Sequence, residues 1–268
     1  MPPTYPSVIA HRGASAIAAE HTAAAYRAAI DSGADGLECD VRLTSDGHLV
    51  CVHDPRIDRT SSGRGRVSNQ TLAQLQEHDF GAWAETADVD EGEILTLSDL
   101  LEMALAAPTP LQLAIETKHP TRYGGYTEQV LVQTLERFGL AGGDAGRVRV
   151  MSFSATAMRR MRDLAPGIPA VYLMDKVPML QRYGSLPYGS LPYGAAVAGP
   201  SIDIVRSDPQ QIQRWLSAGY EVHVWTVDER EDLVACMTQG VSVVITNRPH
   251  DVLQWRDEIW TDLGGPRS

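Results

Sequence analysis

The chain is poor in cysteine, and it has no long apolar run. Its 268 residues include three cysteines, an odd number at well-separated positions. This pattern indicates reduced thiols and a reducing compartment, so we expect a cytoplasmic protein. The N-terminal residues have neither a basic region nor an apolar core, which argues against a secretory signal. No segment approaches the roughly 20 apolar residues that span a bilayer, so we expect no stable membrane association.

The chain also lacks an excess of positive charge. Lysine and arginine number 23 against 34 aspartates and glutamates, which gives a net charge of −11. Nucleic acids and anionic lipid surfaces bind basic faces, so both are poor partners for this chain. A small anionic substrate stays compatible with this charge, because a metal ion and a few local cations can dominate the field of a site.

Strands and helices alternate along the sequence. Strands are predicted at 7–11, 36–41, 111–116, 147–152, 169–173, 201–205, 221–227 and 241–246. Helices are predicted at 20–32, 98–107, 127–138, 155–164, 209–218 and 230–239. Eight such strands in a chain of this length favour an α/β fold of the (β/α)₈ TIM-barrel type, in one domain over 1–268. A short insertion follows the second strand, at about 54–97.

An open doubly wound sheet is the structural alternative. It would carry a glycine-rich phosphate-binding turn after the first strand. The segment 11–15 reads His-Arg-Gly-Ala-Ser and does not match that pattern.

A hairpin over 36–53 brings polar residues together. Asp46-Gly47 is a strong signal for a two-residue turn, and a turn there would place Asp40 opposite His53. Because side chains alternate along a strand, Glu38 and Asp40 share this face, whereas Cys39 points away and serves packing. The alternative is a surface hairpin with ordinary polar residues.

Similar chemistry stands at other strand ends. His11 and Arg12 end the first strand, Glu116 and Lys118 the third, and Trp225 the seventh. Sites in such barrels lie at the carboxyl ends of the strands. Histidines transfer protons near neutral pH, carboxylates bind divalent cations, and basic side chains bind phosphate, so the set suits phosphoester chemistry. A structural salt bridge between Glu116 and Lys118, and a core role for Trp225, are the alternatives.

The remaining histidines have no comparable neighbours in the sequence. We expect structural or solvent-exposed roles for His21, His48, His119, His223 and His250.

The sequence resembles the glycerophosphodiester phosphodiesterase family. The resemblance rests on motifs in order along nearly the whole chain: His11-Arg12-Gly13, Glu20-His21-Thr22, the segments 33–41 and 44–47, Val52-His53-Asp54, Arg59-Thr60, the segment 95–101, Glu116-Thr117-Lys118, the segment 224–227 and the segment 245–249. Two positions depart from the family pattern, His21 where asparagine is usual and Asn247 where aspartate is common.

The resemblance implies a barrel enzyme that hydrolyses small glycerophosphodiesters to sn-glycerol 3-phosphate and an alcohol. It implies one divalent cation, Ca²⁺ or Mg²⁺, with the ligands Glu38, Asp40 and Glu116. It implies His11 and His53 as the acid–base pair, with Arg12 and Lys118 on the phosphate. The resemblance does not decide which histidine is the base or which cation binds. It also leaves open whether the substrate's 2-hydroxyl or water attacks. The identity of the alcohol and the oligomeric state stay open as well.

Two alternative functions remain. The tandem repeat of Tyr-Gly-Ser-Leu-Pro over 183–192, followed by Tyr193-Gly194, could hold an acyl chain and make the protein a lysophospholipase D. A tolerated duplication in a loop is the simpler interpretation. A barrel that binds phosphate or metal without catalysis is the other alternative.

Overall fold

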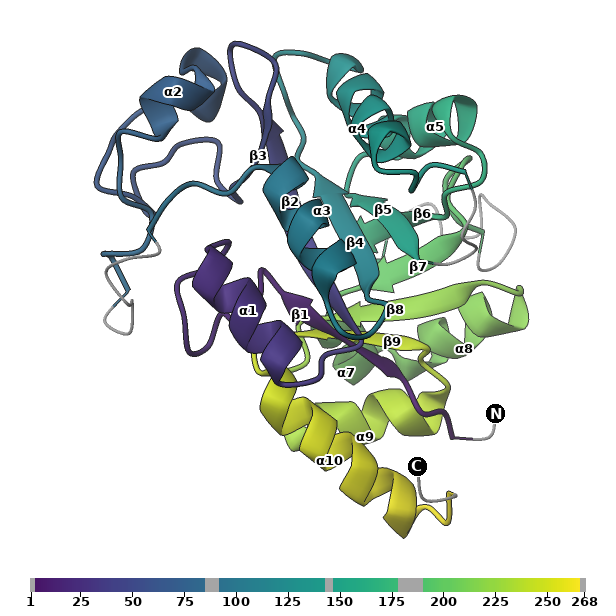
Figure 1. Cartoon of the computed structure of the whole chain (residues 1–268). Helices are drawn as coiled ribbons and strands as arrows, with labels where there is room; N and C mark the ends of the chain where they lie inside the picture. The colour runs from purple at the N-terminus through teal and green to yellow at the C-terminus, as the bar shows by residue number, and fades with distance from the viewer. Residues whose placement is uncertain (1–2, 85–91, 143–146, 178–189, 266–268) are drawn as a thin grey trace.

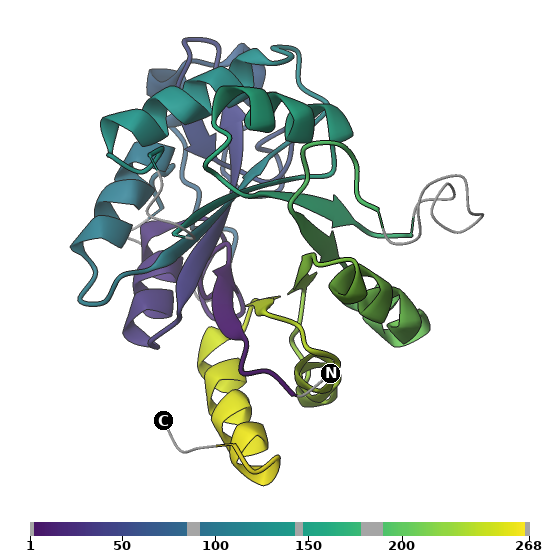
Figure 2. The ribbon, with the colours of Figure 1, turned by 90° about the vertical axis from the view of Figure 1, so that its right-hand side faces the viewer.

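Parallel strands form a closed barrel at the centre of the molecule. The computed structural model describes residues 3–84, 92–142, 147–177 and 190–265. In these residues the barrel strands are β1 (Ser7–His11), β2 (Gly36–Leu43), β4 (Gln112–Thr117), β5 (Val148–Ser152), β6 (Ala170–Met174), β7 (Val197–Pro200), β8 (Glu221–Trp225) and β9 (Val243–Thr246). β1 pairs in parallel with both β2 and β9, which closes the barrel (Figure 1, Figure 2). The predicted (β/α)₈ barrel is confirmed.

Helices cover the outside of the barrel (Figure 1). They are α1 (Ala23–Asp31), α3 (Leu97–Ala106), α4 (Tyr126–Arg137), α5 (Ala155–Leu164), α7 (Ile202–Ser207), α8 (Pro209–Ser217), α9 (Arg230–Gln239) and α10 (Pro249–Asp262). The short helix α2 (Leu72–Leu75) and a 3₁₀ turn at Val67–Asn69 lie in the insertion between β3 (Leu49–Cys51) and α3. None of the helices in the described ranges combines the length and apolar character of a membrane-spanning segment.

Alternation along β2 decides which side chains reach the site. Leu37, Cys39 and Val41 pack in the apolar layer between the barrel and its helices. Glu38 and Asp40 therefore face the interior of the barrel. A separate interior layer that includes Ile9, Met151, Val171 and Ile245 lies inside the strands. The packing role predicted for Cys39 is confirmed, since its side chain is buried in this apolar layer as a free thiol.

The predicted register of the hairpin is wrong by one residue. Val41 pairs with Cys51 in the short strand β3 (Leu49–Cys51), so Asp40 lies opposite Val52, whose N–H donates to the Asp40 carbonyl at 3.0 Å. The turn has three residues, because the Thr44 N–H bonds to the His48 carbonyl at 2.9 Å. Its last residue is Gly47, at a φ of +89°, which suits a three-residue hairpin loop. His53 reaches the site from the segment that follows β3.

The sixth barrel strand is also misplaced in the prediction. The strand is β7 (Val197–Pro200), whereas the segment predicted as a strand at 201–205 lies at the start of α7. The apolar residues Ile202, Ile204 and Val205 face the core from that helix. Val-Ala-Gly-Pro is a weak strand sequence, but Gly199 is required by the close packing of its neighbours. A side chain at that position would come within 2.9 Å of Leu173 and Val171.

The insertion between β3 and α3 has its own small core. Val52, Ile57, Val67, Leu75 and Phe80 are buried together there.

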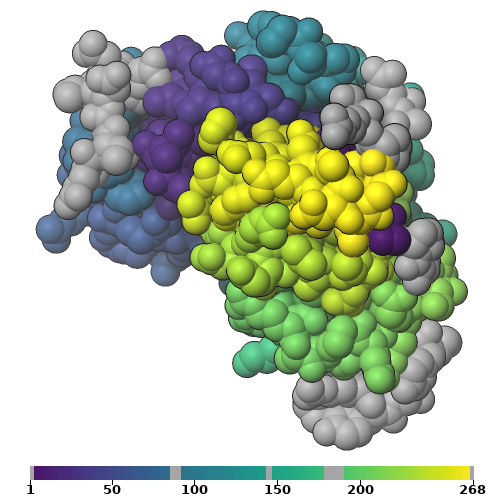
Figure 3. Space-filling view, turned by 90° about the horizontal axis from the view of Figure 1, so that it is seen from below, coloured from purple at the N-terminus to yellow at the C-terminus, as the bar shows by residue number. Residues whose placement is uncertain are grey.

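At the other end of the chain, the helix α10 is not among the elements predicted from the sequence. Figure 3 shows it in yellow beside the yellow-green surface of α9, and Arg256 ties it to the start of β1 by donating to the Pro6 carbonyl at 3.1 Å.

Candidate active site

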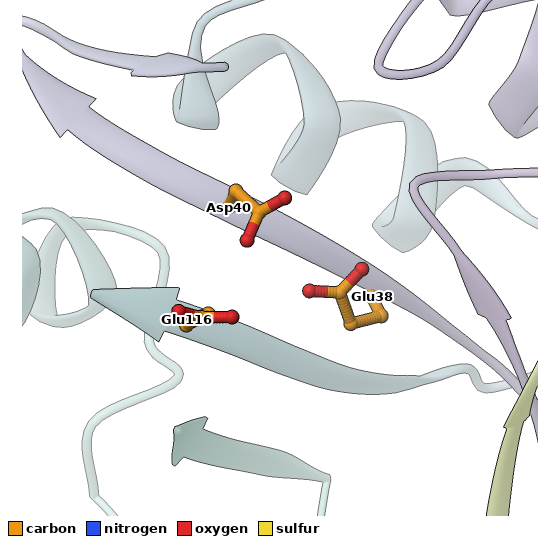
Figure 4. A group of neighbouring side chains, drawn as sticks. All are labelled: Glu38, Asp40 and Glu116. Atoms are coloured by element: carbon orange, nitrogen blue, oxygen red, sulfur yellow. The ribbon is translucent and has the colours of Figure 1, made fainter. Parts of the chain in front are cut away.

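Three buried carboxylates meet inside the barrel (Figure 4). Asp40 on β2 lies directly across the strand ladder from Glu116 on β4, and Glu38 is two residues before Asp40 on the same face. One oxygen from each of the three lies within 4.8 Å of the others. The side chains of Glu38 and Asp40 are almost fully buried, and that of Glu116 nearly so. The structure thus brings together the three carboxylates that the sequence predicts as a cation site.

Basic side chains surround Asp40. Lys118 Nζ lies 3.1 Å from Asp40 Oδ1 and 2.8 Å from Glu116 Oε1. Arg12 Nε lies 3.0 Å from Asp40 Oδ2. His21 Nε2 donates to the same oxygen at 2.9 Å. Each of these groups is held by the end of a strand or by the loop that follows it.

Charge and burial shift the carboxyl pKa values in opposite directions. Burial raises the pKa of Asp40, but the hydrogen bond from His21 and the charges of Lys118 and Arg12 outweigh it and hold the pKa well below its usual value. Burial and the nearby Asp40 charge raise the pKa of Glu38 well above its usual value. The same causes raise the pKa of Glu116 to about 8. Glu38 and Glu116 therefore lack enough neighbouring positive charge to stabilise their ionised forms.

The donor set fits a hard divalent cation. Carboxylate oxygens are the ligands that Ca²⁺ and Mg²⁺ prefer. If all three carboxyls are ionised, as ligands of a cation must be, Arg12 and Lys118 supply two positive charges against three negative ones, which leaves a negative excess where a phosphodiester anion would bind. A divalent cation would reverse that sign and relieve the raised pKa values of Glu38 and Glu116.

Two histidines line the cavity beside this cluster. His11 Nδ1 bonds to Asn247 Oδ1 at 2.7 Å. The Asn247 amide nitrogen donates to Asp228 at 2.6 Å, so its oxygen faces His11 and accepts from Nδ1–H. His53 Nδ1 donates to Asp54 Oδ1 at 2.7 Å. In both imidazoles Nδ1 is therefore bonded to a protein side chain, and Nε2 is left to take part in the chemistry of the site.

The two histidines differ in how readily they take a proton. Burial and the charge of Arg12 lower the pKa of His11 to about 4. Burial also lowers the pKa of His53, with Lys118 and Arg12 adding to this and Asp40 and Asp54 opposing it. The partner of His11 is a neutral amide, whereas the partner of His53 is a carboxylate. His53 is consequently the better place for a positive charge.

The cavity has a volume of about 330 Å³ and a mixed lining. Its polar lining residues include Arg12, His53 and Lys118. Its apolar lining residues are Met151, Phe153, Leu173, Trp225 and Ile245. The Trp225 ring packs edge-on against Phe153 with centroids 5.5 Å apart, and its Nε1 donates to the Gly199 carbonyl at 2.8 Å. Trp225 thus lines this cavity, and its contact with a substrate stays a prediction.

Several groups that hold the site together are not expected from the sequence. His21, for which the sequence predicts a structural or exposed role, is buried and bonded to Asp40. Asn247 orients His11, and Arg59 bonds to both Glu20 and Asp54. The motif Glu20-His21-Thr22 was noted for its likeness alone. Its placement just beyond the first strand was the signal that could have identified His21.

The other histidines lie outside this cavity. His119 bonds to the buried Glu128, and His223 is buried beside Glu221. His48 and His250 are exposed. For these four residues the predicted structural or exposed role is confirmed.

Known proteins resemble this chain over most of its length. The sequence matches the Glycerophosphoryl diester phosphodiesterase family over residues 11–251. The chain belongs to this family. The probable glycerophosphodiester phosphodiesterase 1 of Mycobacterium tuberculosis is 46% identical over 95% of this chain and 93% of the relative. The glycerophosphodiester phosphodiesterase of Bacillus subtilis is 31% identical over 90% of this chain and 83% of the relative.

A solved structure places a ligand in a related barrel. An Oleispira antarctica phosphodiesterase in complex with the product sn-glycerol-3-phosphate superposes with a TM-score of 0.81. It is 27% identical and covers 94% of this chain and 97% of its own. The predicted membership in this enzyme family is therefore confirmed, and a barrel that only binds metal or phosphate is not supported.

Proposed function

We propose that the protein hydrolyses small, water-soluble glycerophosphodiesters to sn-glycerol 3-phosphate and an alcohol, with the help of one divalent cation. The observation that carries this proposal is that His11, His53 and Lys118 line one cavity with Glu38 and Glu116. The product named for the Oleispira antarctica relative supports the same reaction.

Glu38, Asp40 and Glu116 would hold the cation, either Ca²⁺ or Mg²⁺. When bound, such an ion supplies positive charge that offsets the negative charge growing on the phosphate oxygens. Arg12 and Lys118 stand beside the carboxylates and contribute to the same effect from fixed positions. Trp225 and Phe153 line the same cavity and offer an apolar contact surface to the bound diester.

The two histidines divide the proton transfers. His11 is neutral near pH 7 and takes the proton of the attacking hydroxyl on Nε2. His53, supported by Asp54, carries a proton to the oxygen of the departing alcohol. This arrangement serves two attacking groups equally, the 2-hydroxyl of the substrate's glycerol or a water molecule. The first route passes through a cyclic phosphate that water then opens.

Product analysis tests this proposal. The full chain is incubated with glycerophosphocholine and with lysophosphatidylcholine, and ³¹P NMR follows the products. We expect sn-glycerol 3-phosphate from the first substrate and little turnover of the second. A transient cyclic phosphate signal would identify the 2-hydroxyl route. A preference for the lipid would favour a lysophospholipase D instead. The first repeat unit and part of the second, residues 183–189, lie outside the described part of the chain.

A further inference from the structure

A second cavity adjoins the candidate active site. It has a volume of about 240 Å³ and lies between the end of β2, the insertion around 66–69 and the segment that follows β4. Lys118 lines this cavity and also the cavity that holds the histidines. A molecule that extends past Lys118 from the phosphate site would therefore reach the second cavity.

The second cavity is strongly basic. Arg42, Arg66, Arg122 and Lys118 line it, and among its described lining residues there is no carboxylate. In the described part of the chain, no carboxylate forms a salt bridge with Arg42, Arg66 or Arg122. Lys118 binds Asp40 and Glu116, so the three arginines are the cations of this cavity that have no carboxylate partner among the described residues, in a chain with a net charge of −11. Such a set would attract an anion into the cavity.

Two of these guanidinium groups are held in position. Arg42 donates through Nε and Nη2 to the His53 carbonyl at 2.9 and 2.7 Å. Arg122 donates through Nη1 to the Ser68 carbonyl at 3.1 Å and to Asn69 Oδ1 at 2.8 Å. Each guanidinium keeps further N–H groups for a ligand. Because the contacts fix each side chain, binding an anion would cost little side-chain entropy.

A buried hydroxyl gives an independent sign of a ligand. Thr127, in the first turn of α4, lines the cavity and is 1% exposed, and its Oγ1 has no hydrogen-bond partner among the residues that the structure describes. Buried polar atoms in proteins are nearly always bonded, and leaving one unsatisfied is costly. A phosphate oxygen in the cavity would satisfy this hydroxyl.

We propose that the second cavity binds a phosphate group. Two sources share this chemistry: a phosphate on the leaving alcohol of the diester, and free inorganic phosphate. The first source rests on the proposed function, because the diester must occupy the site on the other side of Lys118. The second source does not depend on catalysis.

The substrate arm compares glycerophosphoinositol with its counterpart phosphorylated on the inositol ring. We expect kcat/KM to be higher for the phosphorylated diester by at least about tenfold, as charge-assisted hydrogen bonds would give. The double variant Arg66→Gln and Arg122→Gln should lose this preference and keep turnover of glycerophosphocholine. Arg64→Gln is the matched control, since Arg64 is exposed in the same insertion and does not line the cavity.

The free-phosphate arm uses calorimetric titration of the full chain with inorganic phosphate. A phosphate-binding event that the double variant loses and Arg64→Gln keeps would support the cavity even if no diester were cleaved. Absence of both effects, namely no substrate preference and no phosphate binding sensitive to Arg66 and Arg122, would overturn the proposal. Failure of the proposed function would instead appear as a wild-type chain that cleaves no diester.

Discussion

His11 donates from Nδ1 to the amide oxygen of Asn247, 2.7 Å away. This contact fixes the imidazole with Nε2 toward the site and pairs it with a neutral group. Asn247 is in turn held by Asp228, which accepts from its amide nitrogen at 2.6 Å and from its backbone N–H at 2.8 Å. Burial and the charge of Arg12 lower the pKa of His11 and outweigh the hydrogen bond to Asn247, which raises it, so this histidine remains neutral beside the carboxylate cluster.

The first prediction exchanges the charges of this pair. The double variant Asn247→Asp with Asp228→Asn would place a carboxylate on His11 and raise its pKa by about one unit or more. A base with a raised pKa stays protonated to a higher pH, so the acid limb of the kcat/KM profile should move to higher pH. An unmoved or lowered limb would show that His11 is not the base.

A stability control accompanies that experiment. Asn247→Asp alone would press two carboxylates together, so its melting temperature should fall below that of the double variant. Equal melting temperatures would mean that the Asn247–Asp228 contact has little effect on stability.

The second prediction separates the base from the acid. His53→Ala should lower kcat on glycerophosphocholine by at least about 10², the range for loss of a general acid. A glycerophosphodiester with a p-nitrophenyl group needs no proton on its leaving oxygen, so it should be cleaved by this variant at nearly the wild-type rate. His11→Ala should be slow on both substrates. The reverse pattern would exchange the two roles.

The third prediction concerns Arg59, which links the two sides of the site. It bonds to Glu20 through both terminal nitrogens at 2.8 Å and to Asp54 at 2.7 Å. Glu20 also accepts from Arg12 at 3.0 Å, and Asp54 accepts from His53. Arg59→Met should therefore misplace a phosphate-binding group and a proton donor together.

The expected loss in kcat/KM for Arg59→Met is between about tenfold and about 10²-fold, as small misplacements cause. The basic limb of its pH profile should also move, because the Asp54 carboxylate loses a partner. Arg56→Met is the matched control, since Arg56 forms an exposed pair with Asp58 away from the cavity. Equal losses in the two variants would indicate a general effect on stability or charge.

The fourth prediction concerns the cation and pH. In the cation-free protein the pKa of Glu116 is raised to about 8, so at neutral pH this carboxyl is largely protonated. A cation must displace that proton, so affinity should rise with pH and level off above about pH 8. Calorimetry in two buffers of different ionisation enthalpy measures the released proton. The Glu116→Gln variant should bind the cation more weakly and release fewer protons. A cation affinity of the wild type that does not change with pH would contradict the account.

Sequence reasoning identified the barrel and the groups that line its mouth, because strand alternation and strand ends are local properties. Glu38, Asp40 and Glu116 lie together for that reason. The hairpin register failed because Asp46-Gly47 also suits a three-residue loop that begins at Ser45, and the choice depends on packing. The prediction of the sixth strand failed because the apolar residues Ile202, Ile204 and Val205 fit both a strand and a helix periodicity over so short a segment.

The positioning contacts were beyond local patterns. His21 comes from the loop after β1 and reaches Asp40 on the neighbouring strand β2, whereas Asn247 follows β9 and meets His11 only when the barrel closes. The pairing of Arg59 with Glu20 joins residues 39 positions apart. Apart from the position of His21 just beyond the first strand, no spacing in the sequence indicates these contacts, because they depend on where each loop crosses the end of the barrel.

The most direct test of the account is the turnover of glycerophosphocholine by the full chain before and after removal of bound cation with EDTA. We expect activity to fall by at least about 10² on chelation and to return when excess Mg²⁺ or Ca²⁺ is added, since the cation supplies charge that Arg12 and Lys118 alone do not. Asp40→Asn should show low activity that neither ion restores. Full turnover in a chelated sample shown to be free of metal would contradict the account.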